Sequence, residues 1–173
     1  MKVAIIGAGP RGLWASEELM ERAQERGVAI DVTVFDAKPL EESSAPGAFR
    51  DAVPEEFILN APKSIVETKL GPLDPNDELP GDFPSRKHVG EHLDKSWRAL
   101  EENLPPRCSL THRVENIEMV EPTEGGVDVL GEHFDEVLMV TGHAHDWPGS
   151  LAHADLGDFK VVAPAYPASN LDA

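Results

Sequence analysis

The spacing of hydrophobic and polar residues in the first part of the chain predicts strand, turn, helix and strand in succession. Residues Lys2 to Ile6 form a continuous apolar run, typical of a strand buried on both faces. From about Pro10 to Arg26 the apolar residues recur at helical spacing, and Gly27 is predicted to end this helix. The β-branched run Asp31 to Phe35 predicts a second strand that ends at Asp36. Together these segments predict one βαβ unit.

The middle of the chain has a different pattern. Residues 38–84 are rich in Pro, Gly, Ser and acids, and we expect them to be irregular apart from a strand-like island at Phe57 to Asn60. Residues 85–104 follow a helical pattern, with Ser85 as the candidate N-cap and Pro105 after the end.

The last third predicts short strands followed by a tail. The segment "EPTEGG" is predicted to connect the second and third of these strands as a hairpin. The predicted strands are Ser109 to Thr111, Val114 to Val120, Val127 to Leu130 and Glu136 to Val140. Residues 144–173 carry three prolines and little periodicity, which predicts a connector or tail. We therefore expect one domain over residues 1–143, with an irregular insertion at 38–84.

Composition and charge exclude several classes of function. No apolar stretch in the 173 residues approaches the roughly 20 residues of a membrane span. The start resembles no signal peptide, and the single Cys108 allows no internal disulfide, so we expect a cytoplasmic protein. A formal net charge of −17 argues against nucleic acid and anionic membranes as partners. An anionic ligand would have to be held by local donors.

The glycine-rich turn after the first strand supplies such donors. Gly7, Gly9 and Gly12 have the G-x-G-x-x-G spacing between a predicted strand and a predicted helix. Gly7 would allow the tight turn, Gly9 would let a pyrophosphate approach the backbone, and Gly12 would let helix and strand pack closely. Asp36 follows Gly12 by 24 residues, close to the roughly 20 that this fingerprint requires.

This context favours a dinucleotide site, and the alternative is a glycine turn without a ligand. The N-terminus of the following helix would face the pyrophosphate. The Asp36 carboxylate would accept hydrogen bonds from the adenosine ribose hydroxyls and would repel a 2′-phosphate.

Two histidine pairs resemble metal motifs. "HVGEH" places His88 and His92 four residues apart on one predicted helix, but no third ligand is identifiable. "HAHDW", from His143 to Trp147, lacks the further histidine of the corresponding hydrolase motif. We expect no metal at either pair.

Several motifs together resemble a known family. "VAIIGAGPRGLWASEEL" and "VTVFDA" are similar to the N-terminal FAD-binding unit of two-dinucleotide-domain flavoproteins. "ILNAP", "FPSRKHVGEHL" and "VLMVTGH" follow in the order found in the FAD/NAD(P)-binding family, a relative of flavin-dependent N-hydroxylases and class B-like monooxygenases. The resemblance covers Met1 to His143 in pieces. It implies an α/β fold: a Rossmann-like three-layer domain with a parallel sheet and a β-hairpin or meander insertion.

The resemblance also implies roles for individual residues. Asp36 would hold the adenosine ribose, Asn60 and Arg86 would lie near the flavin, and Thr141 and Gly142 would line the entrance. The residues implied at the pyrophosphate are Gly7, Gly9, Pro10, Arg11 and Gly12. For Asn60 a strand-end cap, and for Arg86 a surface salt bridge, remain alternative interpretations. No catalytic acid or base is identified.

The implied function is the FAD-binding domain of an NAD(P)H-dependent flavoprotein oxidoreductase. Members of the family carry a second Rossmann unit and a second glycine-acid motif, and this sequence has one glycine fingerprint. We therefore expect a fragment without a complete active site, with FAD as its cofactor and NAD(P)H bound by the complete protein. The alternatives are a stand-alone module that binds NAD or FAD, and an NAD-dependent enzyme.

Overall fold

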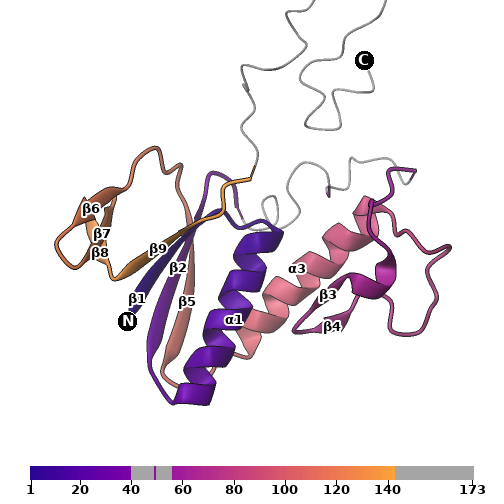
Figure 1. Cartoon of the computed structure of the whole chain (residues 1–173), viewed down its shortest axis with the longest axis horizontal. Helices are drawn as coiled ribbons and strands as arrows, with labels where there is room; N and C mark the ends of the chain where they lie inside the picture. Colours follow the sequence, from indigo (N-terminus) through magenta and orange to yellow (C-terminus); the bar gives the residue numbers. More distant parts are fainter. Residues whose placement is uncertain (40–48, 50–55, 143–173) are drawn as a thin grey trace, which may run out of the picture.

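The computed structural model describes residues 1–39, 49 and 56–142, and these residues contain a four-stranded parallel sheet in the order β5-β2-β1-β9 (Figure 1). The sheet consists of β1 (Lys2–Ile6), β2 (Ile30–Asp36), β5 (Cys108–Val114) and β9 (Glu136–Met139). Helix α1 (Pro10–Arg26) connects β1 to β2, and α3 (Arg86–Glu102) precedes β5. The remaining elements are η2 (Lys63–Ile65), β3 (Glu67–Thr68), β4 (Gly71–Pro72), β6 (Glu121–Thr123), β7 (Gly126–Val129) and β8 (Glu132–Phe134).

The sheet is covered on both faces, which gives three layers. Along β1, Val3 and Ile5 pack in a core with residues of α1 and α3, whereas Ala4 and Ile6 pack in a second core with Val129 of the β6–β7–β8 meander. The alternation follows from the two-residue period of a strand. This architecture confirms the expected Rossmann-like α/β fold with a parallel sheet and a meander.

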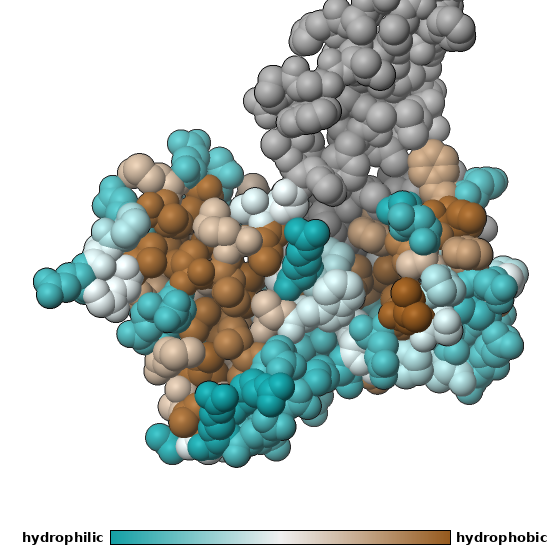
Figure 2. All heavy atoms as spheres, viewed as in Figure 1, coloured by the Kyte–Doolittle hydropathy of each residue, from teal (hydrophilic) through white to brown (hydrophobic). Residues whose placement is uncertain are grey.

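Hydrophobic residues are not confined to the interior. Figure 2 shows them gathered over the sheet and the meander, whereas the exposed face of α1 is polar. The alternation of buried and exposed positions along α1 accounts for this contrast, with Leu13, Met20 and Ala23 buried and the intervening Glu and Arg positions mostly exposed. Within the described residues, no helix is long and apolar enough to cross a membrane.

The strands after α3 differ from the sequence prediction. The predicted strands Ser109 to Thr111 and Val114 to Val120 are replaced by the single strand β5, and residues 115–120, all described, lie outside any strand. The pairing explains the difference, because β5 follows β2 from Ile30 opposite Cys108 to Asp36 opposite Val114. Beyond Asp36 the partner strand has ended. Neither β8 nor β6 was predicted as a strand, and β6 lies inside the predicted connection "EPTEGG".

The insertion also contains more order than expected. Among the residues that the structure describes, the island at Phe57 to Asn60 forms one antiparallel bridge, between Ile58 and Ser85. The hairpin of β3 and β4 was not predicted, and it is attached to both helices by polar side chains. Glu17 of α1 accepts a hydrogen bond from the Lys69 amide at 3.0 Å, and Thr68 contacts Ser96 of α3 at 2.7 Å. Residues 40–48, 50–55 and the predicted tail at 144–173 lie outside the described residues.

Candidate functional site

The glycine turn lies where the carboxyl ends of β1, β2 and β9 meet (Figure 1). The Gly7 amide donates to the Phe35 carbonyl at 2.7 Å, and the Val140 amide donates to the Ile6 carbonyl at 2.9 Å. Gly7 has a φ of 113°, and a Cβ at this position would lie 2.6 Å from the Val140 carbonyl oxygen. Conformation and space therefore both require glycine here. The carboxyl edge of a parallel sheet is also where α/β proteins bind ligands.

The other two glycines have different reasons to be glycine. A Cβ on Gly12 would collide with the Gly7 carbonyl oxygen, so Gly12 permits the close approach of α1 to the turn. Gly9 has φ −67° and ψ −172°, a conformation open to any residue. The backbone therefore does not demand glycine at position 9. A missing side chain there is useful when another group must approach the main chain.

Helix α1 begins with donors suited to an anion. Gly9 is the N-cap and has no side chain with which to cap the helix, and Pro10 at the first helical position has no N–H. The first intrahelical bond runs from the Leu13 amide to the Gly9 carbonyl at 3.1 Å. The amides of Arg11 and Gly12 precede it, at the positive end of a 17-residue helix. Such an end attracts phosphate groups.

Asp36 lies directly beside this turn. Its Oδ2 accepts the Ala8 amide at 2.9 Å, and its Oδ1 accepts the Lys38 amide at 3.1 Å. A carboxylate has about four acceptor positions, so these two bonds leave capacity for a ligand hydroxyl. Sequence reasoning predicted Asp36 only as a ribose ligand. The structure shows in addition that its carboxylate anchors the glycine turn.

A residue that the sequence analysis missed also holds the turn. The Trp97 indole Nε1 donates to the Ala8 carbonyl at 3.1 Å, and the Trp97 side chain is fully buried. Its spacing from Val89 and Leu93, both buried on α3, would have predicted only a core residue. No local signal indicates a contact between residues 89 positions apart.

Asn60 and Arg86 are brought to the start of α3. The Leu59 amide donates to the Pro84 carbonyl, and the Arg86 amide donates to the Phe57 carbonyl, both at 2.8 Å. The exposed Asn60 therefore follows a segment that runs alongside the helix start. The Arg86 guanidinium lies 5.7 Å from the centroid of the Phe49 ring. The N-terminal ends of α1 and α3 lie at the same end of the molecule (Figure 1).

Thr141 and Gly142 lie beside the glycine turn. Both are exposed and follow β9, and Gly142 has a φ of 84°. A Cβ on Gly7 would lie 3.3 Å from the Thr141 Cα, which shows how closely the two segments pack. The structure thus brings the glycine turn, Asp36, Thr141 and Gly142 together, with Asn60 and Arg86 at the start of the neighbouring helix.

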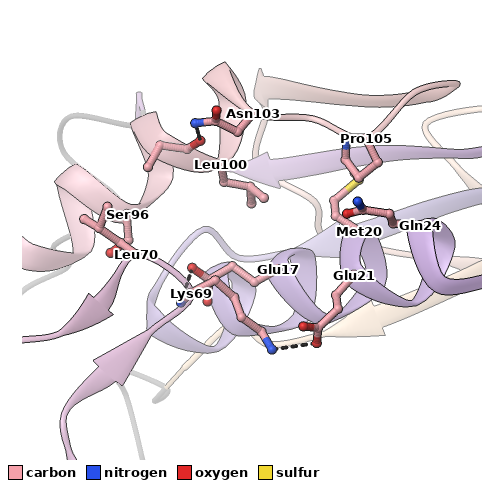
Figure 3. A pocket seen from close by; sticks show the side chains of 11 residues that line it. Glu17, Met20, Glu21, Gln24, Lys69, Leu70, Ser96, Leu100, Asn103 and Pro105 are labelled. Atoms are coloured by element: carbon pink, nitrogen blue, oxygen red, sulfur yellow. Dashed lines mark hydrogen bonds and ion pairs between the residues drawn. The ribbon is translucent and has the colours of Figure 1, made fainter.

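A groove of about 440 Å³ lies elsewhere, between α1 and α3 (Figure 3). None of its lining residues belongs to the glycine turn. Burial raises the pKa of Glu17, which lines this groove. The Lys69 side chain, on the hairpin of β3 and β4, pairs with Glu21 at 2.6 Å. These contacts attach the insertion to α1, and nothing in them points to a dinucleotide.

The histidine pair on α3 has structural contacts. His88 Nδ1 lies 3.0 Å from the Ser85 hydroxyl, and His92 Nε2 lies 3.2 Å from the Thr68 hydroxyl. Burial lowers the pKa of His92 and favours its neutral form. Among the described residues, no three His, Cys, Asp or Glu side chains come close enough to hold a metal ion. His143 and the rest of "HAHDW" lie outside the described residues.

Comparison with known families agrees with this arrangement. A family model described as FAD-NAD(P)-binding matches residues 4–74 and 68–144. These ranges contain every candidate residue described above. No individual curated protein matches the sequence. Because the matched ranges cover most of the chain, this protein, a domain that binds FAD or NAD(P), belongs to the FAD-NAD(P)-binding family.

Proposed function

We propose that this chain is the FAD-binding domain of an NAD(P)H-dependent flavoprotein oxidoreductase. One observation carries the proposal: the start of α1, with a glycine at its N-cap, lies at the carboxyl edge of the sheet beside the Asp36 carboxylate. This arrangement offers donors to a pyrophosphate and an acceptor to a ribose within one turn. The net charge of −17 would repel an anionic ligand, but these backbone donors attract it at short range.

The adenosine half of the cofactor would be held by the glycine turn. The amides at the start of α1 would bind the pyrophosphate, with Gly7, Gly9, Pro10, Arg11 and Gly12 forming the surface against it. The free acceptor positions of Asp36 would bind the ribose hydroxyls. An ionised carboxylate would repel a 2′-phosphate, so the site would select an unphosphorylated ribose.

The flavin half would extend toward the residues that follow β9 and precede α3. Thr141 and Gly142 would line the approach, and Asn60 and Arg86 would lie on the flavin side. FAD would supply the redox chemistry, and the described residues would bind and orient it. NAD(P)H would be held by a second dinucleotide-binding unit outside residues 1–143, with residues 144–173 as the connector. A second glycine fingerprint in the reading frame beyond Ala173 would support this division.

Titration of the purified chain with FAD, followed by flavin fluorescence, tests the proposed cofactor. We expect saturable binding that ADP displaces and that 2′-phosphorylated ADP displaces far less well. If the chain binds NADH but not FAD, the choice of FAD as the cofactor is wrong. A chain that binds neither would overturn the proposed function as a whole.

Replacing Asp36 tests its combined role as the proposed ribose ligand and as the anchor of the Ala8 amide. In Asp36→Ala we expect FAD affinity to fall roughly tenfold to a hundredfold, because hydrogen bonds to a charged acceptor contribute about 1.5–3 kcal/mol. Asp31→Ala is the matched control, since Asp31 is an exposed acid at the opposite end of the same strand. Equal FAD affinity in the two variants would show that Asp36 does not contact the cofactor.

A further inference from the structure

Two consecutive peptide units of the glycine turn are each held by a side chain from elsewhere in the fold. The Asp36 carboxylate accepts the Ala8 amide at 2.9 Å, and the Trp97 indole donates to the Ala8 carbonyl at 3.1 Å. The first contact fixes the peptide between Gly7 and Ala8. The second fixes the peptide between Ala8 and Gly9.

Fixing one end of a peptide unit fixes the other. A trans peptide is planar, and its C=O and N–H point in opposite directions. Because the Ala8 carbonyl points to the buried indole, the Gly9 amide of the same peptide points away from it. The Gly7 carbonyl likewise points away from Asp36, toward Gly12, where a Cβ would collide with it. The direction of the Gly9 amide is therefore set by Trp97.

This peptide needs such a restraint because residue 9 is glycine. A flip of the peptide between Ala8 and Gly9 would carry the φ of Gly9 from −67° to a positive value. Side chains exclude that conformation, but glycine adopts it readily. The flipped peptide would present the Ala8 carbonyl oxygen outward, where it would repel a phosphate. The glycine that permits close approach of the ligand thus also removes the steric barrier to the flip.

The indole is well placed to act as a fixed donor. The Trp97 side chain is fully buried, and its ring meets His112 edge-on with the centroids 4.8 Å apart. Val89 and Leu93 of the same helix lie in the core between α3 and the sheet. A buried indole N–H requires an acceptor, and turning it away from Ala8 would leave it unsatisfied.

We propose that Trp97 is a positioning residue of the cofactor site, whose indole N–H holds the Ala8–Gly9 peptide in the orientation that directs the Gly9 amide toward the pyrophosphate. This inference rests on the proposed function, since it takes the glycine turn as the pyrophosphate site. It adds a buried residue of α3 to the pyrophosphate part of the site, which is otherwise formed by the turn after β1, the start of α1 and Asp36 of β2.

The test compares ligands with and without a pyrophosphate in proteins that lack the indole N–H. Trp97→Phe removes the indole N–H and retains an aromatic ring. Replacement of Trp97 by 3-benzothienylalanine, which has sulfur in place of the N–H, keeps nearly the full size and covers the case in which the phenyl variant does not fold. The control is Trp14→Phe on α1, because Trp14 is exposed. FAD, ADP and adenosine are titrated against each protein.

We expect both Trp97 replacements to lower the affinity for FAD and for ADP by about five- to tenfold, which is the effect of one lost hydrogen bond. The affinity for adenosine should not change. Equal losses for ADP and adenosine would indicate general damage to the fold and would overturn the positioning role. Wild-type affinity for ADP in the benzothienylalanine protein would overturn it as well. If the wild-type chain binds neither FAD nor ADP, the proposed function itself fails. If the wild type binds and the replacements bind equally well, only the role of Trp97 fails.

Discussion

The two α-helices among the described residues begin at the same end of the molecule (Figure 1), but only α3 has a side chain that caps its first turn. Helix α3 starts after Ser85, whose hydroxyl accepts the His88 amide at 3.3 Å. Helix α1 starts after Gly9, which has no side chain to offer. The N-cap backbone conformations have nearly the same φ, −63° at Ser85 and −67° at Gly9. Both are extended, with ψ of 148° at Ser85 and −172° at Gly9, so the larger difference lies in the side chain.

The residues that pack against the two helix starts also differ. At α3 the segment around Ile58 pairs with Ser85, and the neighbouring Pro84 is buried. At α1 the elements that pack against the turn, including Asp36 and Trp97, fix its backbone. One helix start is completed by the chain itself. The other has no side-chain cap among the described residues, and under the proposed function the pyrophosphate would take that place.

Gly12→Ala should break this arrangement most severely. The new Cβ would collide with the Gly7 carbonyl oxygen, so the turn would have to move away from α1. We expect loss of FAD binding and a destabilisation of about 1–3 kcal/mol, the usual range for forced overpacking. Fluorescence titration and thermal unfolding measure the two effects. Gly125→Asn is the control, since Gly125 has a φ of 88° that asparagine tolerates and nothing lies within 4 Å of its Cβ position. An unchanged affinity in Gly12→Ala would refute the packing argument.

Gly9→Ser should give α1 the kind of side-chain N-cap that Ser85 gives α3. Gly9 has an extended backbone, as Ser85 has, and this is the conformation of an N-cap residue whose side chain can accept an amide of the first turn. We expect FAD affinity to fall about tenfold, because a hydroxyl replaces the phosphate as acceptor and blocks its approach. Thermal stability should stay the same or rise slightly, since serine is a marginally better N-cap than glycine. Tight FAD binding by this variant would show that the pyrophosphate does not use the start of α1.

Ser85→Ala should have the smallest effect, confined to stability. Loss of an N-cap hydroxyl costs about 1 kcal/mol, which corresponds to a fall of about 2–4 °C in the unfolding midpoint of a domain of this size. FAD affinity should remain close to that of the wild type. Ser85→Thr, which retains a capping hydroxyl, should recover most of the lost stability. If Ser85→Ala weakened FAD as strongly as Gly9→Ser, the contrast between the two helix starts would be wrong.

Local pattern was sufficient to predict much of this protein. The continuous apolar run before Gly7, the helical spacing after Pro10 and the β-branched run before Asp36 predicted β1, α1 and β2, and Ser85 was correctly identified as an N-cap. These features depend on residues within a few positions of one another. The prediction of strand bounds failed where pairing with a strand distant in the sequence sets the length of an element. β5 extends from Cys108 to Val114 because β2 offers pairing over that length, and the segment after it has no strand beside it in the sheet.

The sequence by itself therefore determined the βαβ unit, its glycine turn and the position of Asp36 at a strand end. Only the tertiary structure decided the strand order, the covering of the second face by the meander, and the orientation of the peptides within the turn. The physical reason is distance along the chain. Ala8 is held by partners 28 and 89 residues away, and such contacts form when the layers pack and leave no trace in local periodicity.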